Sequence, residues 1–265
     1  MEGIRSYQVK RISNEEVTLE EDSIVIEAPL QISINHEAYT VVMRTPGNDI
    51  ELIRGLLYAE DIYKGQKPLD YNKEPSDVKN HDVINVLIPE DEIGKGYLNK
   101  RTLLSVSSCG ICGKQDLESI EVSGDSLKGN HQIQYQHIEK WFLFMKSKQL
   151  VFQETGGLHA MMVLNKNGDI LSVKEDIGRH NALDKAVGDL LETHKIKEAH
   201  CLLVSGRVSY EIISKAFFAK IPVVVAVSAC SSLAIDFAKE FGICLVGFSR
   251  GNKSTIYANP QYISL

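Results

Sequence analysis

Short apolar runs alternate with helical patterns from Gly157 onward, and this alternation restricts the fold more than any other feature of the chain. Five runs read as strands, at 160–164, 170–173, 199–205, 223–227 and 244–248. Helical spacing of apolar residues covers 181–191, 210–219 and 233–241. Strand–helix–strand units of this period predict a largely parallel sheet with helices on both faces.

The first half of the chain reads differently. Residues 1–22 predict an edge strand or a loose lead-in, followed by short strands at 23–28, 31–34 and 39–43 with a turn at 35–37. We expect a helix at 50–57, a surface loop at 64–80, a strand at 83–88 and a helix at 137–150. The change of character predicts two parts, an N-terminal α+β subdomain at 1–135 and a second domain at 136–265.

The length, composition, net charge and cysteine content limit the classes of protein to which the chain can belong. The chain has 265 residues, 43% of them hydrophobic and 24% charged, which is typical of a globular protein. A net charge of -6 gives no support for nucleic-acid binding. Five cysteines, three of them single and in apolar segments, fit a reducing compartment. Without a signal peptide or an apolar span of membrane length, we expect a cytoplasmic protein with no membrane contact.

Four motifs flank predicted strands of the second half. They lie at 154–159, 175–181, 205–209 and 228–232. Helix starts rich in glycine and hydroxyl residues bind anions, and strand ends in such sheets face a shared crevice. With Arg179, Arg207 and Lys215 nearby, a phosphate-bearing ligand is a reasonable expectation. The alternative for any single motif is that its serine caps a helix and its glycine turns the chain.

Three residues in these motifs have two interpretations each. His159 and His180 are candidate acid/base groups, or hydrogen-bonded structural histidines. Asp176 is a candidate to hold a guanine or ribose edge, or to cap the following helix. The residues leave these alternatives open.

The stretch 104–114 holds two cysteines, Cys109 and Cys112, among glycines and serines. Four interpretations compete. A zinc site lacks a second ligand pair, because Cys201, Cys230 and Cys244 are isolated. A thioredoxin-like pair normally opens a helix, which the glycines disfavour. Two packing cysteines would not sit in so polar a segment. A nucleophilic sulfur carrier with an exposed thiolate fits best.

These motifs together resemble the FdhD family of sulfur-carrier proteins required for formate dehydrogenase activity. The resemblance runs from about residue 27 to 257. It rests on the segments 107–113, 155–160, 175–185, 205–207, 231–234 and 247–250, with a first-half match at 43–46, 55–57 and Glu60. Two positions depart from the family: Cys230 replaces a usual proline, and Asp61 replaces a usual glycine. The first would put a third thiol near the site, and the second would reshape a helix end.

The resemblance implies an α/β fold with a C-terminal three-layer domain like that of the cytidine deaminases, a mixed, largely parallel sheet, and a homodimer. The zinc ligands and catalytic glutamate of a deaminase are missing, so no zinc is expected. It implies a sulfurtransferase that takes sulfur from a cysteine desulfurase and passes it to the molybdenum cofactor, Mo-bis(molybdopterin guanine dinucleotide), before insertion into formate dehydrogenase. Guanine nucleotides are expected to mimic that cargo.

The resemblance also assigns residues. Cys109 would carry the persulfide with Cys112 as its companion, both within a cysteine loop at 101–115. The cofactor would be held by residues of the strand-end motifs and of the segment after the last predicted strand: Thr155, Gly156, His159, Asp176, Arg179, His180, Ser205, Gly206, Arg207, Ser231, Ser232, Phe248, Ser249, Arg250, Gly251, Asn252 and Lys253. Two rivals are a non-catalytic cofactor chaperone with a redox-sensing cysteine pair, and a dithiol oxidoreductase.

Overall fold

The computed structural model describes residues 3–14, 16–75, 81–98, 124–129 and 131–265. The cysteine loop at 101–115, with Cys109 and Cys112, lies outside these residues. The described chain forms a six-stranded sheet, a four-stranded sheet and two small two-stranded ones. Within these ranges no helix is both long and apolar enough to cross a membrane.

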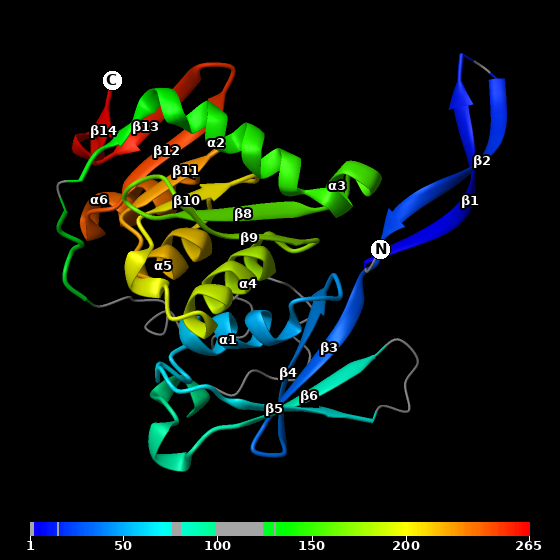
Figure 1. The fold of residues 1–265 in the computed structure, drawn as a ribbon, viewed down its shortest axis with the longest axis horizontal. Helices are drawn as coiled ribbons and strands as arrows, with labels where there is room; N and C mark the ends of the chain where they lie inside the picture. Colours follow the sequence, from blue (N-terminus) through cyan, green and yellow to red (C-terminus); the bar gives the residue numbers. More distant parts are fainter. Residues whose placement is uncertain (1–2, 15, 76–80, 99–123, 130) are drawn as a thin grey trace.

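The chain begins with a hairpin of β1 (Ile4–Ser13) and β2 (Glu16–Val25), which projects from the rest of the molecule (Figure 1). The sequence predicts only an edge strand or a loose lead-in before residue 23. The difference arises because the hairpin buries little: Ile12, Val17 and Leu19 are exposed, so the alternation that marks a half-buried strand is weak.

The N-terminal sheet has the order β4-β3-β6-β5, with β3 at Ala28–Ile34, β4 at Glu37–Arg44, β5 at Asp70–Glu74 and β6 at Asp82–Leu87. Asn35 and His36 both have positive φ and form the two-residue turn between β3 and β4, as expected at 35–37. The prediction of a loop at 64–80 is wrong at β5. Its sequence is Asp-Tyr-Asn-Lys-Glu, and such a polar edge strand gives no hydrophobic signal.

Helix α1 (Asp49–Ala59) covers the N-terminal sheet with the predicted apolar face, burying Leu52, Ile53, Leu56 and Leu57. The other side of α1 packs on α4 (Arg179–Glu192), so this contact joins the two halves of the chain (Figure 1). The boundary expected near residue 135 stays a prediction.

The C-terminal sheet has the order β13-β12-β11-β10-β8-β9. Its strands are β8 (His159–Leu164), β9 (Ile170–Asp176), β10 (Cys201–Val204), β11 (Val223–Ala226), β12 (Cys244–Arg250) and β13 (Lys253–Ala258). Only β10–β11 and β11–β12 pair in parallel, whereas β8–β9, β8–β10 and β12–β13 are antiparallel. The expectation of a largely parallel sheet is therefore wrong. Tight turns after Leu164 and Arg250 make hairpins, and hairpin strands are antiparallel.

Helices cover both faces of this sheet (Figure 1). On one face lie α4, α5 (Tyr210–Phe218) and α6 (Ser232–Phe241), and on the other lies α2 (Tyr135–Lys148), followed by α3 (Leu150–Thr155). Alternate strand residues serve the two cores: Leu202 packs with α4 and α5, whereas Leu203 packs with α2. The strands β7 (Ile133–Gln134) and β14 (Ile263–Ser264) pair beside α2, and 3-10 turns lie at Glu90–Glu92, Lys95–Leu98, Ile196–Glu198 and Pro260–Tyr262.

Candidate functional site

The four strand-end motifs lie together on one side of the C-terminal sheet, where β9, β10 and β11 end, as the sequence predicts; we call this side the edge. β10 and β11 end there, and β9 ends there at Asp176. Because β8 runs antiparallel to β9 and β10, its first residue, His159, lies at the same edge and pairs with Asp176. The edge therefore gathers residues that lie far apart in the sequence.

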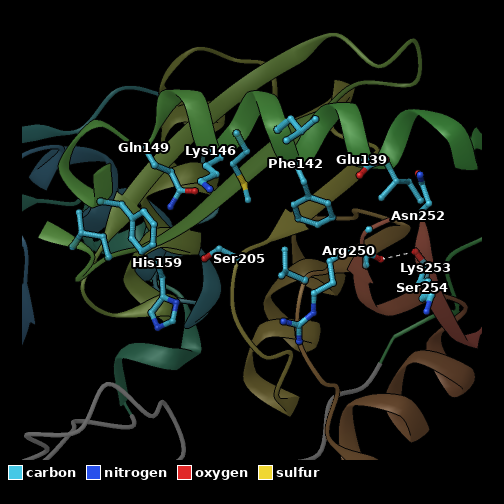
Figure 2. Close-up of a pocket in the computed structure, with 18 of the residues that line it drawn as sticks. Glu139, Phe142, Lys146, Gln149, His159, Ser205, Arg250, Asn252, Lys253 and Ser254 are labelled. Atoms are coloured by element: carbon cyan, nitrogen blue, oxygen red, sulfur yellow. Dashed lines mark hydrogen bonds between the residues drawn. The ribbon is translucent and has the colours of Figure 1, made fainter. Parts of the chain in front are cut away.

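A pocket of about 640 Å³ opens between this edge and α2 (Figure 2). Pockets of about 300–1,000 Å³ are the usual size for small-molecule ligands. Eight of the residues assigned to cofactor binding line it: Gly156, His159, Ser205, Ser249, Arg250, Gly251, Asn252 and Lys253.

One wall of the pocket is the hairpin between β12 and β13. Gly251 and Asn252 have φ values of 58° and 56° and make a two-residue turn, so Arg250 pairs directly with Lys253. Side chains of such a pair project from the same face of the sheet. Inside the hairpin, the Ser249 and Ser254 hydroxyls lie 2.9 Å apart. The turn thus presents two cations side by side at the pocket.

Phe248 precedes this hairpin in a strained conformation. Its φ is 52°, a value that bulky residues rarely adopt, and it sits in an irregular part of the β12–β13 pairing. The Phe248 amide donates to the Ser228 carbonyl, 3.0 Å away, and its side chain is exposed at the edge but outside the pocket lining. Such bulges re-aim the residues that follow, here Ser249 and Arg250.

The pocket edge carries positive charge. Burial, then the charge of Arg179, and to a smaller extent that of Arg207, lower the pKa of His159. Gly206 packs against the His159 ring, and a Cβ there would lie 3.1 Å from Nδ1. Among the described residues, Arg179, Arg207, Arg250 and Lys253 form no ion pair, and the buried Arg179 Nε has no hydrogen-bond partner. Cations left without carboxylates favour an anionic ligand.

Two of the assigned residues are held in protein networks instead. Asp176 is fully buried, pairs with Lys185 Nζ at 2.7 Å, and accepts from the Thr45 and Gly178 amides. His180 is also buried, with Nε2 3.2 Å from Glu211 and 3.4 Å from the Ser209 hydroxyl. For both, the structural interpretation left open by the sequence fits these contacts better.

The remaining assigned residues lie near the edge but do not line the pocket: Thr155, Arg179, Gly206, Arg207, Ser231, Ser232 and Phe248. Ser231 caps α6 by accepting from the Ala234 amide, which is the capping role that the sequence leaves as its alternative. Cys230 is half-buried, and burial raises its pKa to about 11. Its thiol therefore stays protonated near neutral pH and is a poor nucleophile.

The sequence misses the wall that α2 contributes. Its residues, and Gln149 directly after it, face the hairpin across the pocket: Tyr135, Ile138, Glu139, Phe142, Leu143, Met145, Lys146 and Gln149. The signal was present, because Glu139, Phe142 and Lys146 lie three and four residues apart on one helix face, where two charges interrupt an apolar stripe.

Comparisons with known proteins agree with this picture. A sulfur carrier protein FdhD from Sulfolobus acidocaldarius is 38% identical over 263 residues and covers 99% of both chains. One of the same name from Mycobacterium tuberculosis is 36% identical and covers 97% of both. A crystal structure of a putative formate dehydrogenase accessory protein from Desulfotalea psychrophila superimposes with a TM-score of 0.76 at 20% identity, over 98% of this chain and 99% of that one, and so has the same fold.

The pattern of the FdhD/NarQ family matches residues 25–264, which include both sheets, the pocket and the cysteine loop but leave out most of the projecting hairpin. The chain therefore belongs to the FdhD/NarQ family.

Proposed function

We propose that this protein accepts sulfur as a persulfide from a cysteine desulfurase and transfers it to Mo-bis(molybdopterin guanine dinucleotide) before that cofactor enters formate dehydrogenase. The observation that carries the proposal is the cation-lined pocket at the strand ends. Relatives that match this chain over almost its whole length are named sulfur carrier proteins. The cargo is anionic through its phosphates, and Arg250 and Lys253 lie side by side to receive them.

The first step is a thiol exchange at Cys109. Its thiolate attacks the outer sulfur of the desulfurase persulfide, the donor's S–S bond breaks, and the donor cysteine leaves as a thiolate. Cys109 now carries a persulfide. Cys230 does not compete for this role, because burial keeps its thiol protonated.

The second step releases the sulfur. The Cys112 thiolate attacks the inner sulfur, on Cys109, so that a Cys109–Cys112 disulfide forms and the outer sulfur leaves as sulfide for the metal. The two cysteines supply the two electrons that reduce the sulfur. A cellular dithiol then has to reduce the disulfide before the next cycle.

The pocket residues of this chain hold the cargo while this happens. Arg250 and Lys253 bind phosphate oxygens, and Ser205 offers a hydroxyl at the same edge. The neutral His159 imidazole lies beside Arg179 and can take up a proton as the anionic ligand enters.

We further propose that the C-terminal sheet, with helices on both faces, is related to the cytidine deaminases. We also propose that the protein acts as a homodimer, and sedimentation velocity tests this oligomeric state.

Mass spectrometry of the protein after incubation with a desulfurase and cysteine tests the proposal. The peptide that contains Cys109 should gain one sulfur atom, Cys109→Ala should gain none, and the control Cys230→Ala should still be loaded. An unloaded wild-type protein that nevertheless binds GDP would support a cofactor chaperone instead. Arg250→Ala should weaken GDP binding in calorimetry, and unchanged affinity would remove this residue from the phosphate site.

A further inference from the structure

We infer that α2 forms the wall that recognises the base of the bound nucleotide and that Glu139 is the residue that selects guanine. The inference rests on the proposed function and concerns the side of the pocket that the strand-end motifs do not form. It assigns a role to residues for which the sequence motifs give none.

Three side chains of α2 that line the pocket change along the helix from acidic to aromatic to basic. Glu139, Phe142 and Lys146 succeed one another at spacings of three and four, so they share one helix face, and all three line the pocket. Figure 2 shows Glu139 and Asn252 toward one end of the pocket and Gln149 and His159 toward the other, with the Phe142 ring pointing into the space between them. Along α2 the ligand therefore meets the Glu139 carboxylate, then the Phe142 ring and then the Lys146 ammonium group.

The carboxylate is the informative member of this row. Glu139 is half-buried, and within the described part of the chain it forms no hydrogen bond and no ion pair, although Lys253 and Arg250 line the same pocket. Among the described residues that line the pocket, it is also the one acidic residue. A site meant only for phosphate would be weakened by this charge. A free carboxylate at one end indicates that this part of the ligand presents hydrogen-bond donors.

Guanine presents such donors. Its N1–H and 2-amino group point the same way, and the two oxygens of a carboxylate accept from both. Adenine offers one donor and one acceptor on the matching edge, so its acceptor nitrogen would face a carboxylate oxygen. Phe142 supplies a face on which a base can stack. With the base at this end, the phosphates extend toward Arg250.

Calorimetric titration of three nucleotides that differ at position 2 of the base tests the role of Glu139. GDP has a 2-amino donor there, inosine diphosphate has a hydrogen, and xanthosine diphosphate has an oxo acceptor. Wild-type protein should bind GDP about tenfold more tightly than the other two, because a buried acceptor left unpaired is costly. Glu139→Gln should lose this preference and gain about tenfold for xanthosine diphosphate, since its amide N–H can donate to the oxo group.

Two further variants separate the possible failures. Glu154→Gln changes an exposed carboxylate on α3, outside the pocket, and should keep the wild-type ranking. Arg250→Ala should weaken all three nucleotides alike. An unchanged ranking in Glu139→Gln, with GDP still bound in an Arg250-dependent way, would overturn the base-reading role and leave the proposed function standing. A wild-type protein that binds none of the three would overturn both.

Discussion

Gly55 of α1 and Gly188 of α4 lie where the two helices cross, and a Cβ atom added at Gly188 would lie 2.9 Å from the Gly55 amide nitrogen. The backbones are in direct contact here: a Cβ at Gly55 would lie 1.9 Å from the Asp184 carbonyl oxygen, and one at Gly188 would lie 1.8 Å from that of Glu51. No side chain, not even a methyl group, fits between the helices. This crossing fixes the N-terminal sheet relative to the sheet that carries the pocket.

Gly55→Ala or Gly188→Ala should therefore destabilise the protein by about 3 kcal/mol or more, because helix backbones have to move apart to admit the methyl group. Urea unfolding measures the change. Gly156→Ala is the control: its φ is 66° but nothing lies within 4 Å, so only backbone strain of about 1 kcal/mol is expected. Equal effects at Gly156 and Gly55 would contradict the close crossing.

A buried ion pair forms a second link between the halves. Lys185 Nζ lies 2.7 Å from Asp176 and donates to the Thr45 carbonyl at 2.8 Å, while Asp176 accepts from the Thr45 amide at 3.1 Å. Lys185→Met leaves a buried carboxylate without its partner, and we expect a loss of about 3–5 kcal/mol. The exposed Lys166→Met should change stability by less than about 0.5 kcal/mol.

Adding Asp176→Asn to Lys185→Met should recover part of that loss, since the unpaired charge is then gone. A double-mutant cycle from urea unfolding gives the coupling free energy. Additive effects of the two substitutions would show that the pair does not act as a unit.

The elements that could be predicted from the sequence are those that bury much apolar surface. The strands at 160–164 and 223–227 are buried on both faces and stand out as continuous apolar runs, whereas α4 to α6 stand out by helical spacing of apolar residues; all are confirmed to within a few residues. β5 and β13 were missed because they are polar edge strands. The sheet is less parallel than expected because two of its strand pairs are hairpins. A hairpin turn is only a few residues long, so it is harder to recognise in the sequence than a buried strand.

Asp61 follows α1 with a φ of 59°, in the left-handed region that favours glycine. Aspartate is among the few other residues that adopt this conformation. The expectation that Asp61 reshapes the helix end stays a prediction.

The site could be predicted only on its strand side. The edge motifs are contiguous stretches, and their convergence follows from sheet topology. The α2 wall depends on how a helix near residue 140 lies over a hairpin near residue 251. The spacing of Glu139, Phe142 and Lys146 marks one helix face, but no local pattern shows that this face meets the hairpin. For Asp176 and His180, burial decides between ligand binding and structure, and that requires the packed fold.

Asp184 predicts a pH dependence of stability. It is buried beside Lys215, and burial, opposed by the Lys215 charge, raises its pKa from 3.8 to about 6. Between these values the folded protein holds a proton that the unfolded chain has lost, so this group's contribution to stability falls as pH rises toward about 6 and is then constant.

The difference in unfolding free energy between wild type and Asp184→Asn isolates this contribution, because the other titrating groups largely cancel. We expect the difference to decrease from about pH 4 to about pH 6 and to level off above. A difference that grows over this range would show that pairing with Lys215, rather than burial, sets the pKa of Asp184.

His159 predicts a pH dependence of ligand binding. Burial and the neighbouring Arg179 lower its pKa below 6.5 in the free protein. A bound phosphate group beside the ring would raise that pKa, so binding takes up a proton and GDP affinity should rise as the pH falls from about 7.5 to about 6. His159→Gln removes the titrating group and should flatten this dependence, whereas His137→Gln, at an exposed position of α2, should preserve it. Calorimetry at the two pH values measures both slopes. An unchanged slope in His159→Gln would mean that the ligand's charge does not reach this histidine.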